Sequence, residues 1–342
     1  MKKLKAFPRS LLLMSTAMIL LLSLVLSGCN TGSTAPITAS TTSSVTLPTT
    51  QTTIPPTSAV TTPPVTTAPA TIPPATTAPV TVPPTTATVP QTTVPATTQR
   101  GEYIGSLYTR QFLETLDRTM HGCASWGAVN DKNRPTQAIA LTERFQKYDA
   151  RFIGEDNNSI YLSYNCGYEY QNLTTVILDT LKEKGAKATF FVNLHFARTN
   201  PQVIQRIISE GHTLGNHCAN HPELPTLSID GIVEEIMTLH NYIQETFHYE
   251  MKVFRPPSGY YSEQVLAIAQ SLGYRTYNFS FTYVDWETAN QPDPTATLQN
   301  QISKAHSGAI YQLHSVSSTN ATILGPLIDN LRAKGYSFAA LR

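Results

Sequence analysis

The chain has 342 residues, with 24 Lys and Arg against 23 Asp and Glu and a formal net charge of +1 at pH 7. Because the positive and negative charges are almost equal, there is no reason to expect a nucleic-acid partner. Nucleic acids bind strongly basic protein surfaces. Of the four cysteines, Cys29 lies near the N-terminus, and Cys123, Cys166 and Cys218 lie in the C-terminal part. Three thiols allow at most one disulfide among themselves.

The first 28 residues predict an export signal. Lys2, Lys3, Lys5 and Arg9 precede an apolar run that ends at the small residues of "LSG". A basic start, a short apolar run and small residues at its end are typical of a cleavable signal. A permanent membrane span usually needs a longer apolar stretch.

The stretch "LSGC", which ends at Cys29, resembles the lipobox of bacterial lipoproteins, in which the signal is cut before a cysteine that is then lipidated. An ordinary secretory signal followed by a chance cysteine is the alternative. Acyl chains on Cys29 would hold the protein on the extracellular face of the cytoplasmic membrane, because each buried CH₂ contributes about 0.8 kcal/mol.

Residues 29–100 predict a disordered linker, rich in Thr and Pro. Between Cys29 and Arg100 there is no charged residue, and repeats such as "TTAPATIPPATTAPVTVPP" fill the segment. Such a composition buries too little apolar surface to fold, and its prolines favour extended geometry. At about 3.1 Å per residue, a stalk of roughly 70 residues would span on the order of 200 Å. It would carry the following domain into the cell wall.

Residues 101–342 predict one domain in which strands and helices alternate. Apolar runs predict strands at 159–164, 188–192, 212–217, 252–257, 275–281, 308–314 and 336–341. Helical patterns lie between them, near 172–185, 201–211, 229–247, 262–272, 296–305 and 321–334. Seven strands alternating with helices indicate a parallel sheet covered by helices, either a closed barrel or a doubly wound sheet.

Unusual polar residues occur at or just after the ends of five predicted strands. Both barrels and doubly wound sheets gather such positions at one rim, where functional groups lie. The residues are Asn165, Cys166, His217, Arg255, Asp285 and His314. We therefore expect a single site at the carboxyl ends of the strands.

The segment "NHCANH" places His217 and His221 four residues apart. On a helical turn or in a tight loop, two imidazoles at that spacing share a face and can bind one metal ion. Taken alone, the pair fits exposed or structural histidines as well. Likewise, a lone Arg255 beside two prolines or a lone His314 at a strand end fits a structural role.

Several segments, in this order and spacing, resemble the polysaccharide deacetylase (NodB homology) family, the carbohydrate esterases of family four. They are "SWG", "KYDARFIG", "IYLSYNCGYEY", "GAKATFFV", "GHTLGNH", "FRPPSG", "GAIYQLHSVS" and "LRAKGYSF". The resemblance covers roughly residues 123–342 and is strongest to the branch that deacetylates muramic acid in peptidoglycan. It implies a distorted (β/α) barrel of about seven strands and hydrolysis of the acetamide of an N-acetylated sugar.

The resemblance also implies roles for particular residues. His217 and His221 would bind a divalent metal, commonly zinc, and His314 would protonate the departing amine. Arg255 would orient a catalytic base, and Asp285 would tune His314. The residues expected to contact the glycan are Tyr168, Tyr260, Trp286 and Leu313.

The first motif departs from the family pattern. Asn165 stands where the family has its base Asp, and an amide does not accept a proton near neutral pH. Loss of a general base typically costs about 10²- to 10⁴-fold in rate. Cys166 stands where the family has its metal-binding Asp. Its thiolate would complete a three-ligand site with His217 and His221, or it would pair with Cys218 in a disulfide, or both thiols would be buried without a role.

Three hypotheses for function follow. One is an exported peptidoglycan N-deacetylase that is impaired at its base. The second is a catalytically inactive protein of the same fold that binds N-acetylated glycan through aromatic side chains. The third is a redox-gated or metal-sensing module built on Cys166 and Cys218.

Overall fold

The computed structural model describes residues 107–123 and 126–342. The predicted export signal, Cys29 and the predicted linker lie outside the described residues. Among the helices of the described part, none is long and apolar enough to cross a membrane.

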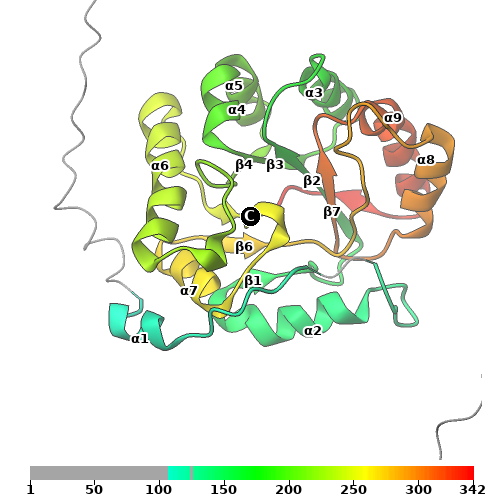
Figure 1. Cartoon of the computed structure of the whole chain (residues 1–342). Helices are drawn as coiled ribbons and strands as arrows, with labels where there is room; N and C mark the ends of the chain where they lie inside the picture. The colour runs from blue at the N-terminus through cyan, green and yellow to red at the C-terminus, as the bar shows by residue number, and fades with distance from the viewer. Residues whose placement is uncertain (1–106, 124–125) are drawn as a thin grey trace, which may run out of the picture. The chain divides into compact units, whose positions relative to one another are not determined.

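A parallel sheet forms the centre of the fold (Figure 1). Its strands follow the order β1-β6-β5-β4-β3-β2-β7, and β8 pairs with the start of β2. The bounds are β1 Ala150–Arg151, β2 Ser159–Cys166, β3 Ala188–Val192, β4 Thr213–Asn216, β5 Val253–Phe254, β6 Arg275–Tyr277, β7 Ala309–His314 and β8 Ser337–Phe338. Every pairing between these strands is parallel. The seven strands predicted from the sequence are confirmed.

The sheet curls until the chain beyond β6 reaches β7. The Ser280 amide donates to the Ile310 carbonyl at 3.1 Å, and the Gln312 amide donates to the Phe281 carbonyl at 2.9 Å. On its other side β7 pairs with β2, from Ile160↔Ala309 to Asn165↔His314. The distorted barrel expected from the sequence is thereby confirmed. Its strand ends bring residues far apart in the chain to one rim.

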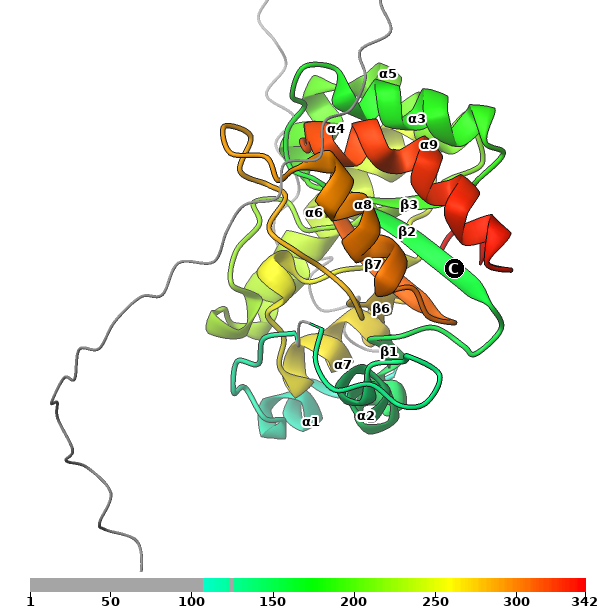
Figure 2. The ribbon, with the colours of Figure 1, turned by 90° about the vertical axis from the view of Figure 1, so that its right-hand side faces the viewer.

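Helices surround the sheet (Figures 1 and 2). Their bounds are α1 Arg110–Thr115, α2 Thr136–Phe145, α3 Leu173–Glu183, α4 Leu194–Thr199, α5 Pro201–Ser209, α6 Ile229–Phe247, α7 Glu263–Ser271, α8 Pro294–Ser303 and α9 Ser318–Ala333. Helix α8 packs beside α9, and α9 packs against α3. Figure 2 shows α1 and α2 lying near β1 and α7.

Local signals explain where the helices begin and end. Ser228 caps α6 by accepting a hydrogen bond from the Gly231 amide, and His248 ends it in the left-handed region at φ 53°. The sequence pattern predicted α6 with the bounds that the structure shows. Helices α1 and α4 have six residues each, too few to show an apolar periodicity. The two-residue strand β1 is similarly too short to predict.

Side-chain alternation along β2 separates two environments. Ser163 and Asn165 contact the Arg255 side chain on the inner side of the curled sheet. Tyr164 and Cys166 belong instead to the large apolar cluster between the sheet and the helices. Because successive side chains of a strand point to opposite faces, the two residues of the first motif face in opposite directions.

Gly308, just before β7, is predicted to tolerate no side chain. Its φ is +77°, and a Cβ there would lie 2.4 Å from the Gly154 carbonyl oxygen and 2.5 Å from that of Glu155. Gly273 has a similar φ of +84°, but no atom of the described residues lies within 4 Å of such a Cβ. We expect Gly273→Ala to cost roughly 1–2 kcal/mol for the left-handed backbone alone, and Gly308→Ala to cost clearly more. Urea unfolding of both variants measures the difference, and equal losses would contradict the predicted clash.

Candidate active site

Arg255 lies at the centre of the site, directly after β5. Its side chain is fully buried. Nη1 donates to the Asn165 Oδ1 at 3.1 Å, and Nη2 donates to the Ser163 Oγ at 2.7 Å. The carbonyls of Tyr277 and Asn278 accept two further hydrogen bonds at 3.0 and 3.1 Å. This network fixes the guanidinium in one orientation.

The Arg255 charge has no carboxylate partner among the described residues. Its guanidinium lies 4.1 Å from the centre of the Phe191 ring, so an aromatic face supplies part of the missing attraction. Burial lowers the pKa of Arg255 to about 9, and the group stays cationic at neutral pH. A buried charge without an opposite charge is costly, so the position of Asn165 is electrostatically suited to an anion.

Asn165 is the residue that fills this position. It is 9% exposed and pairs in register with His314 on β7. Its Oδ1 is engaged by Arg255, and an amide has no proton-accepting group near neutral pH. The side chain can orient a neighbouring group, but it cannot act as a base.

His217 and His221 come together after β4, with ring centroids 4.9 Å apart. The Nδ1 of His217 lies 2.8 Å from the Arg255 carbonyl oxygen. Because a carbonyl only accepts, Nδ1 carries the hydrogen and Nε2 carries a lone pair. That Nε2 is buried and has no hydrogen-bond partner within the described part of the chain. Burial, with the neighbouring His221, holds the pKa of His217 well below its usual value.

The loop between these histidines is held in an unusual backbone conformation. Cys218 and His221 have φ values of 67° and 60°. The Asn216 Oδ1 accepts a hydrogen bond from the Cys218 amide at 2.9 Å, and the Asn216 Nδ2 donates to the Ile236 carbonyl at 2.9 Å. The loop therefore places together the two imidazoles that could hold a metal ion.

The structure does not bring Cys166 to this pair. The thiol is fully buried, and its hydrogen-bond acceptor is the Tyr164 carbonyl oxygen at 3.9 Å. Burial raises the pKa of Cys166 to about 12, which keeps it a neutral thiol at physiological pH. Within 107–123 and 126–342, no three His, Cys, Asp or Glu side chains are grouped to hold a metal ion. The predicted centre of Cys166, His217 and His221 is not assembled, and a metal-binding role for Cys166 stays a prediction.

Cys166 and Cys218 are free thiols in this structure, as is Cys123. Strand β3 lies between β2, which ends at Cys166, and β4, which precedes Cys218. Cys166 and Asn216 both pair with Val192, so their Cα atoms lie two strand spacings apart, roughly 9–10 Å, and Cys218 follows Asn216 by two residues. The structure favours the hypothesis of buried thiols over the disulfide gate.

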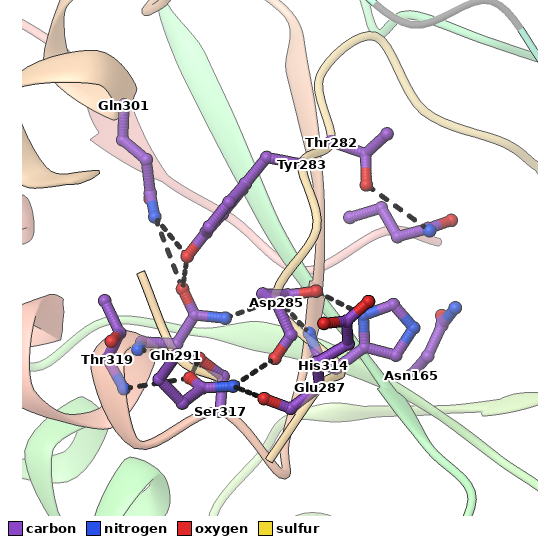
Figure 3. Close-up of polar contacts among 12 residues, drawn as sticks. Asn165, Thr282, Tyr283, Asp285, Glu287, Gln291, Gln301, His314, Ser317 and Thr319 are labelled. Atoms are coloured by element: carbon purple, nitrogen blue, oxygen red, sulfur yellow. Dashed lines mark hydrogen bonds and ion pairs between the residues drawn. The ribbon is translucent and has the colours of Figure 1, made fainter. Parts of the chain in front are cut away.

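His314 and Asp285 form a second polar unit at the rim (Figure 3). The His314 Nδ1 donates to the Asp285 Oδ1 at 2.6 Å, and the His314 amide donates to Oδ2 at 2.8 Å. Asp285 is fully buried, whereas the His314 side chain is 21% exposed. Figure 3 shows the second ring nitrogen of His314 on the side of Asn165. The arrangement leaves one nitrogen of His314 available to a ligand.

The residues predicted to contact the glycan differ in their exposure. Trp286 is 47% exposed, and its ring centroid lies 5.4 Å from that of His314. Tyr168 is 46% exposed, on the loop after β2. Tyr260 is half-buried. Leu313 is buried in the apolar cluster on the helix side, because it alternates with His314 along β7, so the structure does not bring it to the rim.

The residues that hydrogen-bond to Arg255 and Asp285 and hold them in place were not predicted from the sequence. Ser163 binds Arg255, and Asn320 donates to the Asp285 Oδ2 at 2.6 Å. Gln291 donates to the Asp285 carbonyl at 2.9 Å. Strand alternation could have found Ser163, two residues before Asn165. Nothing in the local pattern marks Asn320 or Gln291.

Residues 154–277 match the polysaccharide deacetylase family. The chain is 37% identical to the peptidoglycan-N-acetylmuramic acid deacetylase PdaA of Bacillus subtilis over 221 residues, which cover 64% of this chain and 84% of PdaA. The chain belongs to the polysaccharide deacetylase family, carbohydrate esterase family 4. The solved structure of B. subtilis PdaA has a TM-score of 0.61 and 34% identity, covering 66% of this chain and 96% of that chain.

A second solved relative in this family is described as a pseudoenzyme, from Bacillus anthracis. It has a TM-score of 0.53 and 27% identity, covering 56% of this chain and 67% of that chain. A mutant of that protein is described as having restored enzymatic activity, with the same TM-score and identity. The polysaccharide deacetylase fold thus occurs both in a protein described as a pseudoenzyme and in a mutant of it described as having restored enzymatic activity.

Replacing Asn165 by Asp is expected to stabilise the protein. The carboxylate would receive the Arg255 hydrogen bond as an anion, and hydrogen bonds to charged groups contribute about 1.5–3 kcal/mol. Pairing lowers the pKa of such an Asp in the folded state, so the gain is present above the unfolded pKa of about 3.9 and is lost as pH falls below it.

Urea unfolding at pH 7 and at pH 3 measures this gain. Asn157→Asp is the control, because it adds the same charge at an exposed position whose Oδ1 already accepts from the Ser159 amide. If Asn165→Asp is no more stable than the wild type at pH 7, the claim that the charge of Arg255 favours an anion at position 165 is wrong.

Zinc binding is expected to depend on the histidines and not on Cys166. Because its thiol is neutral and lies in the apolar cluster, Cys166→Ala should leave the zinc affinity of the reduced protein within about twofold of the wild type. His217→Asn should weaken binding at least about tenfold. Isothermal titration with zinc tests both expectations. A large loss of zinc affinity in Cys166→Ala would show that the Cys166 thiolate does bind the metal.

Proposed function

We propose that this protein is a peptidoglycan N-deacetylase whose catalysis is impaired because an amide, Asn165, stands in place of the catalytic base. The observation that carries the proposal is the Asn165 Oδ1 accepting a hydrogen bond from Arg255, at the position where the family has its base. The other functional groups of the resemblance remain at the rim: the two imidazoles, the buried guanidinium and the His314–Asp285 pair.

Hydrolysis of an acetamide adds the oxygen of water to the carbonyl carbon, breaks the C–N bond and releases acetate and an amine. Deacetylases of this family are generally metal-dependent. His217 and His221 would hold the divalent ion, taken as zinc, which supplies a Lewis acid to polarise the acetamide carbonyl when bound. His217 fits that role, since its buried Nε2 has no hydrogen-bond partner among the described residues, and the His221 ring centroid lies 4.9 Å from that of His217.

His314 supplies the proton that the leaving amine needs. Its Nδ1 is committed to Asp285, which orients the ring and stabilises the imidazolium, and its second nitrogen carries the proton to be transferred. The proton of the attacking water has no acceptor at Asn165. The acid half of the site is therefore complete, whereas the basic half is missing.

The proposal places the enzyme outside the cell. A lipidated Cys29 would hold it on the membrane, and the stalk of residues 29–100 would carry the domain to the glycan strands of the wall. PdaA, whose name gives peptidoglycan N-acetylmuramic acid as its substrate, supports the choice of a muramic-acid glycan over other N-acetylated polymers.

Glycan binding without hydrolysis is the second candidate function. The half-exposed rings of Trp286 and Tyr168 favour it, because exposed aromatic faces at a rim stack on sugar rings. Sedimentation with purified peptidoglycan separates the two candidates: binding that depends on Trp286, without acetate release by any variant of the first motif, supports a binding protein.

Restoring the first motif is expected to restore activity. In the double variant Asn165→Asp, Cys166→Asn, the zinc-loaded protein should release acetate from muramic-acid glycan about 10²- to 10⁴-fold faster than the wild type, since a general base contributes that factor. The single variant Asn165→Asp measures how much of this rate gain comes from the base. Adding His314→Gln to the double variant should remove the gain. Equal rates for the wild type and the double variant would refute the proposal.

A further inference from the structure

Asn320, in the first turn of α9, is the described residue whose side chain holds the Asp285 carboxylate from behind. Its Nδ2 donates to the Asp285 Oδ2 at 2.6 Å, and the side chain is 2% exposed. Asp285 thus accepts three hydrogen bonds, two from His314 and one from Asn320. The two His314 donors belong to β7, whereas the Asn320 amide belongs to α9.

The orientation of the Asn320 amide is set by its neighbours. The Tyr283 hydroxyl donates to the Asn320 Oδ1, and the Gln301 Nε2 lies within 3.3 Å of the same oxygen. Gln301 also donates to the Tyr283 hydroxyl at 3.2 Å. Because two donors face Oδ1, the NH₂ of the amide must face Asp285. A flipped amide would set its NH₂ against the NH₂ of Gln301 and its oxygen against the Asp285 carboxylate.

A second connection ties the same loop to the start of α9. Gln291 donates to the Asp285 carbonyl at 2.9 Å and to the Glu287 carbonyl at 3.0 Å. Its own oxygen accepts from the Ser317 Oγ at 2.6 Å (Figure 3). The beginning of α9 therefore fixes both the backbone and the carboxylate of Asp285.

We propose that Asn320 is a positioning residue for His314, acting through Asp285, with Tyr283 setting the orientation of its amide. Asn320 touches neither glycan nor attacking water in this role. It keeps the carboxylate where the Nδ1–H of His314 can reach it, and so keeps the other ring nitrogen directed at the substrate. The inference rests on the proposed acid role of His314.

The test uses Asn320→Leu, which keeps the volume and removes the donor, and Tyr283→Phe, which removes only the hydroxyl. Thr322→Val is the matched control, because Thr322 is exposed on the same helix and its Oγ1 donates within that helix, to the Ser318 carbonyl. Proton NMR of the otherwise unaltered protein reports the hydrogen-bonded Nδ1–H of His314. Acetate release in the Asn165→Asp, Cys166→Asn background reports kcat and KM.

We expect the downfield Nδ1–H resonance of His314 to be lost in Asn320→Leu, weakened in Tyr283→Phe and unchanged in Thr322→Val. In the restored background, kcat should fall at least about tenfold for Asn320→Leu and about threefold for Tyr283→Phe, with KM changed less than about twofold. A purely structural contact would not produce this split between kcat and KM.

A retained resonance and an unchanged kcat in Asn320→Leu would overturn the proposal. If Asn320→Leu does not fold, Tyr283→Phe decides, because an unaltered resonance and rate in that variant contradict the proposed orientation of the amide. If the restored background is inactive, the proposed function fails, whereas the resonance still decides whether Asn320 positions His314.

Discussion

A buried guanidinium without a carboxylate is the constraint on which the site depends. Arg255 uses its hydrogen bonds to join β5 to β2 and to the chain beyond β6, so it holds the inner face of the curled sheet together. The structural requirement at position 165 is an acceptor for the hydrogen bond from the Arg255 Nη1. Asn meets that structural requirement and leaves the chemical one unmet, since an amide accepts the Arg255 hydrogen bond but not a proton. Under the proposed function, fold and catalysis make different demands on position 165, and this would explain how the fold is kept without a base.

At His314, the proposed general acid, the supporting contacts are all present. His314 and Asp285 keep a short hydrogen bond, and α9 supports it through residues that never reach a ligand. Such support is costly to maintain, because buried polar groups must all be satisfied. The relative from B. anthracis shows that this family includes a protein described as a pseudoenzyme and a mutant of it with restored activity.

Much of this architecture follows from the sequence. The seven strands are short apolar runs bounded by turns, and parallel connection brings their carboxyl ends to one rim, so the meeting of Arg255, His217 and His314 was predictable. The side that Cys166 faces was not predicted, because the family likeness assigned it to the metal although the alternation along β2 turns it away from Asn165. Leu313 was misplaced for the same reason. Asn320 was missed because its role arises from tertiary contacts between α9 and the loop before α8, which leave no local pattern.

Chemical rescue tests the central claim most directly. In the zinc-loaded variant Asn165→Gly, Cys166→Asn, removal of the side chain leaves space beside Arg255 for a small carboxylate. Added formate should then raise acetate release from muramic-acid glycan in a saturable manner, whereas the unaltered protein should show no response, because Asn165 fills that space. Formate-independent rates in the Gly variant, or brisk hydrolysis by the unaltered protein without formate, would contradict the claim that the missing carboxylate limits catalysis.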